Sequence, residues 1–466
     1  MTSSSPAAQR WDARLWTALF LLCGVLFLDG LDVSMVGVAL PSIQADLGLT
    51  TSQLQWVISA YVLGLGGVLL LGGRAADLLG RRRVLIAALS VFTLASLMGG
   101  LVDSGALLIA ARFLKGVAAA FTVPASLSLL TTTFTEGPAR NKAMAIFNAF
   151  GASGFSFGLV FGGLLTEVGW RWTFLLPVPV AALLLFLMPR YIARDRPHIG
   201  QKRRYDLPGA LLLTAGMLLL VRTIVEAPNA GWAAPETIAA FLLAAGLLAA
   251  FVAVERRAPQ PLVRLGILRS APLVRANLGA MCLFGAYVGF QFVATLYLQK
   301  TLQWSALETA LAFLPAGLFV AVGAPRMGTV ITRYGTAKPI VASTVAFAAG
   351  YALFLRVDAT PYVLTFLPTI MLLGLGFALG YAALSVQATA GVSDHEQGLA
   401  AGLVQTSFQM GGAIVLAAVS AVVGQGTISD YRTAIAIVLG VAVLSLVLAL
   451  TGVVRPRTDE VVATAS

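Results

Sequence analysis

The sequence predicts an all-α integral membrane protein, and three observations lead to that class. Hydrophobic residues make up 58% of the 466-residue chain and charged residues only 11%, whereas a soluble domain carries about 25% charged residues. The apolar residues are gathered into runs close to the length that a bilayer-spanning helix needs, about 20 residues. These runs lack the period-two alternation of membrane β-strands, and helices are then the structure that satisfies the backbone in lipid.

Fourteen apolar segments follow one another along the chain. They cover residues 15–38, 52–72, 84–102, 105–130, 143–166, 172–189, 207–226, 237–254, 276–299, 308–325, 339–355, 360–386, 397–423 and 433–454. With this count, 24 Lys and Arg residues fall at the two ends of the chain and in every second loop, and only 4 fall in the other loops. Cytoplasmic loops are enriched in Lys and Arg, so the bias predicts fourteen transmembrane helices with both termini in the cytoplasm. The net charge of +11 then reflects topology, not nucleic-acid binding.

Two long basic stretches divide the segments into six, two and six. Residues 190–206 follow the sixth segment, and residues 255–275 follow the eighth. We therefore predict an N-terminal six-helix half (1–189), cytoplasmic loops with two inserted helices (190–275), and a C-terminal six-helix half with a short tail (276–466). A weak internal repeat agrees with two halves, because Gly73 and Gly80 are spaced like Gly328 and Gly335 in equivalent loops.

Signals for other chemistry are lacking in the sequence. The polar residues 1–14 precede a long apolar run without a small-residue cleavage site, so we expect a retained first helix and not a signal peptide. Cys23 and Cys282 lie inside apolar segments and are expected to be packing residues. His198 and His395 lie in loops, and no Walker-type phosphate loop is present. We expect no enzyme, no metal and no cofactor, and no direct use of ATP.

The first apolar segment contains two acidic residues, Asp29 and Asp32. A charged side chain in the middle of a membrane helix costs about 2.5–3.5 kcal/mol on insertion scales. The two residues are three positions apart and therefore share one face of a helix. They are candidates for a site that takes up and releases protons; the alternative is a structural hydrogen-bond acceptor.

Arg112 and Lys115 lie in the fourth segment. A buried Arg needs a carboxylate or several carbonyl groups, and Asp32 or Asp29 would provide one if the first and fourth helices pack together. Arg112 would then respond to the protonation of the carboxylate, or would form a static ion pair that fixes the packing. The sequence does not say which way Lys115 points.

Two glycine motifs complete the candidate residues. The first is Gly73-Arg-Ala-Ala-Asp77-Leu-Leu-Gly80-Arg81-Arg82-Arg83, in which Gly80 permits a tight turn and Asp77 can face a helix N-terminus. The second places Gly154, Gly158, Gly162 and Gly163 in the fifth segment, at the spacing that lets helices approach closely. The alternatives are an ordinary basic loop and an ordinary packing face.

Together these motifs resemble the 14-helix drug:proton antiporter family (multidrug efflux type) of the major facilitator superfamily. Residues 73–83 are similar to its signature between helices 2 and 3, and Leu31-Asp32 through Ala39-Leu40-Pro41 to its helix-1 signature. Arg112-Phe-Leu-Lys115-Gly116 is similar to its Arg-x-x-Gln-Gly motif, and the Gly154–Gly163 run to its antiporter motif. The chain departs from the family pattern at Ser34, Gly37, Leu78, Lys115 and Leu159.

The resemblance implies a major facilitator fold and a proton-coupled antiporter that exports small lipophilic, cationic compounds (drugs, dyes, antibiotics) by alternating access. It assigns proton coupling to Asp32, to which the buried charges add Asp29 and Arg112 as candidates. It assigns a conformational latch to the loop motif, of which Gly73, Asp77, Gly80, Arg81 and Arg82 are the candidate residues. It further implies a monomer in the inner (cytoplasmic) membrane. Its partners would be a small-molecule substrate, protons and the lipid bilayer. Exporters of an endogenous metabolite or self-made antibiotic, and a proton-coupled uptake permease, remain alternatives.

Polar and aromatic side chains inside the apolar segments are candidates for a substrate cavity. A polar amide within a membrane helix needs a partner or water, and Gln405 and Gln409 share one helix face. Each of these residues could equally serve in packing. The set is Tyr61, Phe147, Phe155, Gln291, Gln299, Gln405 and Gln409.

Overall fold

The computed structural model describes residues 11–135, 138–193, 207–258, 265–323, 326–356, 364–392, 397–423 and 427–453. Over these ranges every regular element is a helix, which confirms the all-α class. Eleven of the helices are long and apolar enough to cross a membrane, and three shorter apolar stretches lie at residues 53–69, 153–168 and 208–224.

The helices before the long basic stretch form a first group. They are α1 (Ala13–Leu47), α2 (Thr51–Leu79), α3 (Arg81–Leu101), α4 (Gly105–Thr133), α5 (Pro138–Val168), α6 (Trp172–Leu175) and α7 (Pro177–Tyr191). The segment expected as one helix over 172–189 is divided at Leu176, because Pro177 lacks an amide hydrogen and starts a new helix.

Two helices, α8 (Leu207–Ala230) and α9 (Pro235–Glu255), separate this first group from a second. The second group contains η1 (Leu265–Arg269), α10 (Ala271–Leu296), η2 (Tyr297–Thr301), α11 (Ala306–Gly323), α12 (Met327–Tyr334), α13 (Ala337–Phe354), α14 (Phe366–Thr389), α15 (Gln397–Val422) and α16 (Ile428–Val453).

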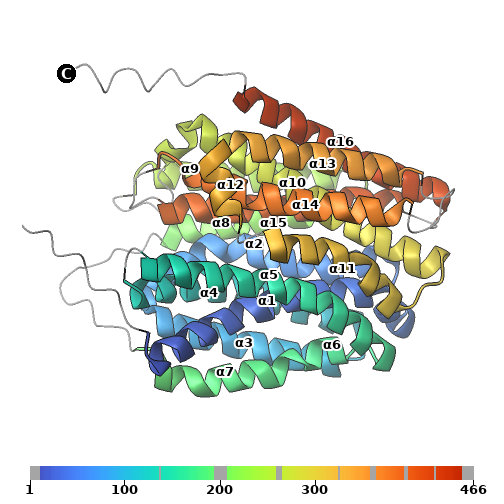
Figure 1. Ribbon diagram of the computed structural model, residues 1–466. Helices are drawn as coiled ribbons and strands as arrows, with labels where there is room; N and C mark the ends of the chain where they lie inside the picture. Colours follow the sequence, from blue (N-terminus) through green and yellow to red (C-terminus); the bar gives the residue numbers. More distant parts are fainter. Residues whose placement is uncertain are drawn as a thin grey trace, which may run out of the picture.

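The long helices run side by side across the molecule (Figure 1). The start of α1 and the end of α16 lie on the left of that view, which we call the terminal side, and the right is the opposite side. The first group fills the lower part of the view and the second group the upper part. Helix α8 packs against α2 and α15, and so touches both groups.

The two groups repeat one packing scheme. Helix α1 packs against α5 as α10 packs against α15, and α2 against α4 as α11 against α14. A Cβ atom on Gly154 of α5 would lie 2.9 Å from the Cα atom of Phe27, and one on Gly411 of α15 would lie 2.5 Å from the Cα atom of Met281. Each group is therefore held together by a glycine that lets two helix backbones touch.

The glycine pairs of the predicted repeat lie in different structures. Helix α2 continues to Leu79, so Gly73 belongs to the helix and not to the loop that follows. Gly328 lies in the short helix α12. Gly80 and Gly335 do form turns, with φ of 102° and 71°, values at which a residue without a Cβ atom is favoured.

Candidate functional site

Asp32 lies on α1 at the level where this helix makes its closest approach to α5. A Cβ atom on Gly30 would lie 2.8 Å from the carbonyl oxygen of Gly151, and one on Gly158 would lie 2.9 Å from the Cα atom of Leu31. The next polar residue, Ser34, donates its hydroxyl within α1 to the carbonyl oxygens of Gly30 (3.1 Å) and Leu31 (3.2 Å). The α5 glycines thus fix the position of α1, and Asp32 projects toward α4.

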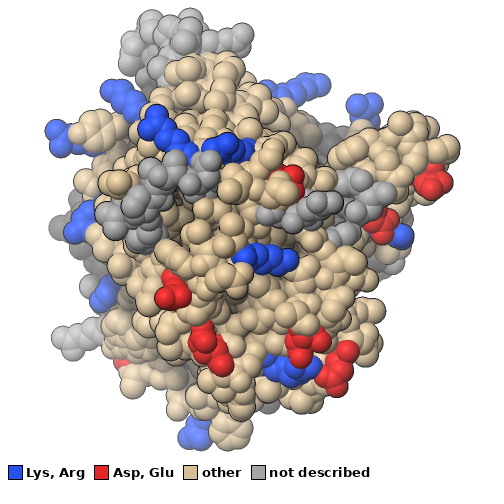
Figure 2. All heavy atoms as spheres, turned by 90° about the vertical axis from the view of Figure 1, so that its right-hand side faces the viewer, with Lys and Arg blue, Asp and Glu red and all other residues tan. Residues whose placement is uncertain are grey.

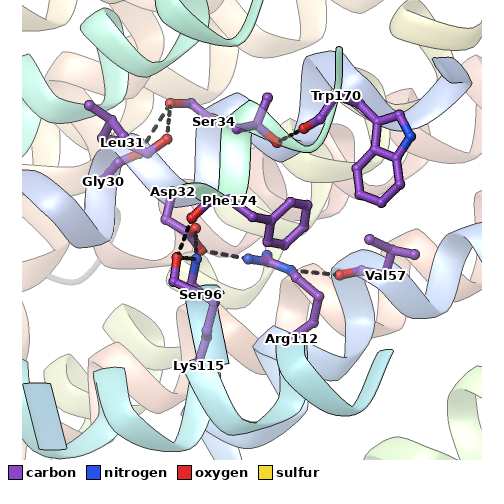
Figure 3. Close-up of polar contacts among 11 residues, drawn as sticks. Gly30, Leu31, Asp32, Ser34, Val57, Ser96, Arg112, Lys115, Trp170 and Phe174 are labelled. Carbon is purple, nitrogen blue, oxygen red and sulfur yellow. Dashed lines mark hydrogen bonds and ion pairs between the residues drawn. The ribbon is translucent and has the colours of Figure 1, made fainter. Parts of the chain in front are cut away.

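A single carboxylate, that of Asp32, meets two cations from α4 (Figure 3). Nη1 of Arg112 lies 2.5 Å from Oδ2, and Nζ of Lys115 donates to Oδ1. Asp32 and Lys115 are fully buried, and Arg112 is 1% exposed. Arg112 and Lys115 are three residues apart, so one face of α4 presents both. The expected contact of Arg112 with a carboxylate of α1 is therefore present, and Lys115 points to the same group.

The remaining donors of the two cations are also occupied. Nε of Arg112 donates to the carbonyl oxygen of Val57 on α2 at 2.9 Å. Nζ of Lys115 also donates to Oγ of Ser96 on α3 at 3.0 Å, and that hydroxyl donates to the carbonyl oxygen of Phe174 on α6 at 2.7 Å (Figure 3). A buried ion pair is tolerated when hydrogen bonds satisfy its other polar atoms. This cluster meets that condition with groups from five helices, α1, α2, α3, α4 and α6.

Aromatic rings surround the two cations. The guanidinium carbon of Arg112 lies 4.6 Å from the ring centre of Tyr61, and Nζ of Lys115 lies 4.6 Å from that of Phe92 and 5.3 Å from that of Phe174. Such contacts stabilise a desolvated cation through the quadrupole of the ring. Tyr61 therefore belongs to the charge cluster.

Asp29 is one turn from Asp32 on the same helix, but its surroundings differ. It is 7% exposed. Oδ2 accepts a hydrogen bond from the hydroxyl of Thr122 on α4 at 3.3 Å. Within the described part of the chain, no Lys or Arg makes an ion pair with this carboxylate. The structure thus brings Arg112 to Asp32 and not to Asp29.

The glycines of α5 contact two helices. A Cβ atom on Gly162 would lie 2.8 Å from the Cα atom of Met35, so Gly154, Gly158 and Gly162 all face α1. A Cβ atom on Gly163 would instead lie 2.9 Å from the Cα atom of Leu307 on α11. The motif therefore packs α5 both within the first group and against the second.

The basic loop motif is described in part. The surroundings of Gly73 and the side chain of Asp77 lie outside what the structure describes. Arg81 donates to the carbonyl oxygen of Ser128 at 3.4 Å, and Arg82 donates to that of Pro189 at 2.8 Å. These bonds attach the start of α3 to the terminal-side ends of α4 and α7.

The three aromatic cavity candidates lie at separate places. The ring of Tyr61 contacts the guanidinium group of Arg112. Phe147 is 3% exposed and packs in the core of the first group. Phe155 is half-buried and lies 6.1 Å, centre to centre, from the ring of Tyr287 on α10. Phe155 therefore contacts an aromatic ring of the second group.

The glutamine candidates lie along the contacts between helices. Nε2 of Gln299 donates to the carbonyl oxygen of Val38 at 3.0 Å, and Oε1 of Gln405 accepts from the hydroxyl of Tyr381 at 3.2 Å. The other two lie beside glycines. Gln291 is next to Gly37 and Gln409 is next to Gly66.

Sequence reasoning missed a set of aromatic residues that we call the second-group aromatic cluster: Phe284, Tyr287, Phe377, Tyr381 and Phe408. Its ring centres are 5.0 Å apart for Tyr287 and Phe377, 5.5 Å for Phe377 and Tyr381, and 4.7 Å for Tyr381 and Phe408. Phe155 extends it across to the first group. The spacings of 284 to 287 and 377 to 381 match one helix face and were the available signal.

Three hydrogen bonds join the two groups near the opposite side. The hydroxyl of Ser420, near the end of α15, donates to Oε1 of Gln55, near the start of α2. The amide of Leu307 donates to Oε1 of Glu167 at 3.4 Å, and Gln299 reaches Val38 as described above. In this state the groups are therefore joined by hydrogen bonds at that side.

The opposite face carries charges of both signs (Figure 2). Arg171 pairs there with Asp46 (2.7 Å) and with Asp103 (2.5 Å). The hydrogen bonds that Arg171 donates to Asp46 and to Asp103 raise the pKa of Arg171. The guanidinium thus joins the ends of α1 and α3 on the first group's outer surface.

Comparisons with known proteins agree with one another. The Major Facilitator Superfamily model matches residues 22–416 and 276–465. The chain is 39% identical to the puromycin resistance protein pur8 of Streptomyces alboniger, over 96% of this chain and 92% of that protein. It is 38% identical to the cephamycin export protein CmcT of Amycolatopsis lactamdurans, over 94% and 92%.

Solved structures with the same fold are more distant in sequence. The nucleoside transporter NupG has a TM-score of 0.68 at 15% identity, covering 93% of this chain and 98% of that one. A D-xylose-proton symporter also has a TM-score of 0.68, at 13% identity, covering 94% and 97%. At such identities the likeness concerns the arrangement of helices.

Proposed function

This chain belongs to the major facilitator superfamily, and from that premise we propose that it is a proton-coupled antiporter that exports small lipophilic cations. It is a multi-pass protein of the inner membrane, and its curated relatives are antibiotic resistance and export proteins. In the proposal it works as a monomer by alternating access, without a cofactor, and the proton gradient drives it.

The proposed topology has fourteen crossings. It adds the three shorter apolar stretches, in α2, α5 and α8, to the eleven long helices and counts α6 with α7 as one. Both termini then lie in the cytoplasm, which the distribution of Lys and Arg supports.

The observation that carries the proposal is the buried charge cluster. Asp29, Asp32, Arg112 and Lys115 are all at least 93% buried and lie on two apolar helices. Ionisable groups inside a membrane protein mark proton or ion pathways far more often than simple packing. Exchange of one proton for one monovalent cation moves no net charge, so the pH difference drives it, and each pH unit sustains a concentration ratio of about tenfold.

The lipophilic character of the substrate rests on the second-group aromatic cluster. Phe284, Phe377 and Tyr381 of this cluster are half-buried, and flat apolar rings suit drug-sized ligands. The names of the relatives, which include puromycin resistance, cephamycin export and tetracenomycin C resistance and export, support compounds of antibiotic size.

Export of a self-made antibiotic or another endogenous product is the second candidate. The relative named as a cephamycin export protein supports it. The same transport cycle would serve both candidates, and they differ in the physiological substrate.

Energised everted membrane vesicles test the proposal. Respiration acidifies their lumen, so an exporter that exchanges protons accumulates ethidium inside and loses it when an uncoupler is added. We expect this of the wild type and not of the Asp29→Asn/Asp32→Asn variant or of vesicles without the protein. If neither ethidium nor puromycin accumulates, the export of lipophilic cations is refuted. Accumulation in right-side-out vesicles that exceeds the passive uptake of vesicles without the protein would instead identify an uptake permease.

A further inference from the structure

We infer that Asp29 is the carboxylate that takes up and releases the proton, and that Lys115 is a fixed counter-ion which, together with Arg112, keeps Asp32 ionised. This inference rests on the proposed proton coupling. It reassigns the exchange step from Asp32, the residue that the helix-1 motif favours, to Asp29.

The first step concerns Asp32, whose two oxygens are both engaged by cations. Oδ2 accepts from Arg112 and Oδ1 from Lys115. A proton on either oxygen would displace one of these donors and leave two buried cations without an adjacent carboxylate. Breaking one side of a buried ion pair is strongly unfavourable because the remaining charge has no solvent. Asp32 is therefore expected to stay ionised throughout the cycle.

The second step concerns Lys115, which is held from several directions. Its ammonium group donates to Ser96 as well as to Asp32 and lies between the rings of Phe92 and Phe174. The side chain is fully buried. Motion of this cation would break a network that joins α1, α3, α4 and α6, so Lys115 acts as a positioning residue for Asp32.

The third step concerns Asp29, whose contact on α4 is the neutral hydroxyl of Thr122. That hydroxyl lies 3.3 Å from Oδ2 of Asp29 and also 3.3 Å from the carbonyl oxygen of Ala119. When Asp29 is ionised, the hydroxyl can donate to it. When Asp29 is protonated, the hydroxyl can accept from the carboxyl group and donate to Ala119 instead. Thr122 thus satisfies both protonation states without movement of the backbone.

The wider surroundings contain few other groups that could exchange the proton. The charged groups near Asp29 are Asp32, Arg112 and Lys115, and Tyr61 on α2 is the nearby phenol. Among the described side chains of the other helices packed on α1, charged groups lie at the helix ends: Arg140, Lys142 and Glu167 on α5, Arg190 on α7, Arg275 on α10 and Glu308 on α11.

The charge balance gives the coupling. With both carboxylates ionised, the charges of Asp29, Asp32, Arg112 and Lys115 cancel. Protonation of Asp29 leaves one net positive charge in a buried site, which repels a bound cation. One proton and one monovalent cation would therefore alternate at this cluster.

The first test needs no substrate. Infrared difference spectra of the purified full-length protein between high and low pH report the carbonyl stretch of a protonated carboxylic acid. We expect a titrating band in the wild type, its loss in Asp29→Asn, and its persistence in the charge-balanced variant Asp32→Asn/Lys115→Gln. A band that survives in Asp29→Asn and disappears in the double variant would overturn the inference, as would a wild type without a titrating band.

A second variant keeps every charge in place. Thr122→Val removes the hydroxyl that serves both states of Asp29 and should move the midpoint of the band, whereas Thr122→Ser should restore it. An unchanged midpoint in Thr122→Val contradicts the role of this hydroxyl and with it the assignment to Asp29.

Transport separates this inference from the proposed function. In proteoliposomes, Asp29→Asn should lose accumulation of ethidium driven by a pH gradient, so that the inside-to-outside ratio falls to about one, while exchange of labelled for unlabelled ethidium continues. Wild-type accumulation that is also present in Asp29→Asn refutes the inference but leaves proton antiport standing. Absence of accumulation by the wild type refutes the proposed function. The infrared spectra then still test whether Asp29 is the carboxylate that takes up the proton.

Discussion

At the scale of single residues, the buried charges depend on neutral partners as much as on one another. Ser96 accepts from Lys115 and donates to the carbonyl oxygen of Phe174. It is fully buried and so connects the charge cluster to α6. A neutral hydroxyl in such a place fixes the direction of a cation without adding a charge.

Ser96→Ala should therefore destabilise the protein by about 1–3 kcal/mol, because it leaves a buried ammonium group with an unmet donor. Thermal unfolding in detergent measures the loss. Ser90→Ala is the matched control on the same helix, since Ser90 donates within α3 to the carbonyl oxygen of Ile86. Equal losses of stability for the two substitutions would mean that Ser96 contributes no more than a hydrogen bond within its own helix.

Arg112 is a second residue whose shape matters beyond its charge. Its guanidinium donates to both Val57 and Asp32, and an ammonium group on a flexible stem cannot reproduce that fork.

Arg112→Lys should lower gradient-driven ethidium efflux by at least tenfold, because a loss of about 1.4 kcal/mol corresponds to that factor. Efflux from cells, normalised to the amount of protein in the membrane, is the measurement. Arg222→Lys is the control, since Arg222 makes an exposed pair with Glu226 on its own helix. Comparable activity of Arg112→Lys and the control would show that charge alone suffices at position 112.

At the scale of helices, glycine contacts set how closely α1 and α5 approach. A Cβ atom on Gly154 would overlap the backbone of Phe27, which cannot rotate away as a side chain could. The two helices would have to move apart. This movement would displace the face of α1 that carries Asp29 and Asp32.

Gly154→Ala should reduce stability by about 1–3 kcal/mol, the usual effect of overpacking. Gly246→Ala on α9 is the control, because nothing lies within 4 Å of a Cβ atom there and Ala favours a helix by roughly 0.8–1.0 kcal/mol over Gly. The two variants are expected to shift the unfolding temperature in opposite directions. A rise for Gly154→Ala would rule out tight backbone contact between α1 and α5.

At the scale of the whole molecule, particular hydrogen bonds join the two groups near the opposite side. Gln55 and Ser420 connect α2 to α15 there, and Glu167 connects α5 to α11. If the groups rock during transport, these contacts have to separate and re-form.

A short thiol crosslinker applied to Gln55→Cys/Ser420→Cys should abolish ethidium transport, and a reversible reagent should allow recovery on reduction. The background needs Cys23 and Cys282 replaced by Ser. Asn277→Cys/Ser407→Cys is the matched pair, because Asn277 and Ser407 are hydrogen bonded at 2.7 Å within the second group. Continued transport through the crosslinked 55–420 pair would contradict a cycle in which α2 and α15 part.

The inserted helices α8 and α9 also affect how the two groups contact each other. Helix α8 packs on both α2 and α15, and a Cβ atom on Gly67 of α2 would lie 2.6 Å from Cδ2 of Leu218 on α8. The insert therefore covers one seam between the groups, whereas α5 and α11 form another seam without it.

The sequence by itself determined the all-α membrane class, the approximate places of the apolar helices and the family. Apolar runs in a chain with 11% charged residues leave helices as the way to satisfy the backbone in lipid. The motif spacings also indicated Asp29, Asp32, Arg112 and the α5 glycines, because residues three or four apart share a helix face whatever the helix packs against.

Only the tertiary structure decided which helix faces meet. It paired Arg112 with Asp32, turned Lys115 to the same carboxylate and left Asp29 to Thr122. It also assembled the second-group aromatic cluster from α10, α14 and α15. Periodicity along one helix gives the residues on a face, but the partner of that face depends on the relative rotation and height of two helices. Those follow from packing of the whole chain, which no single segment encodes.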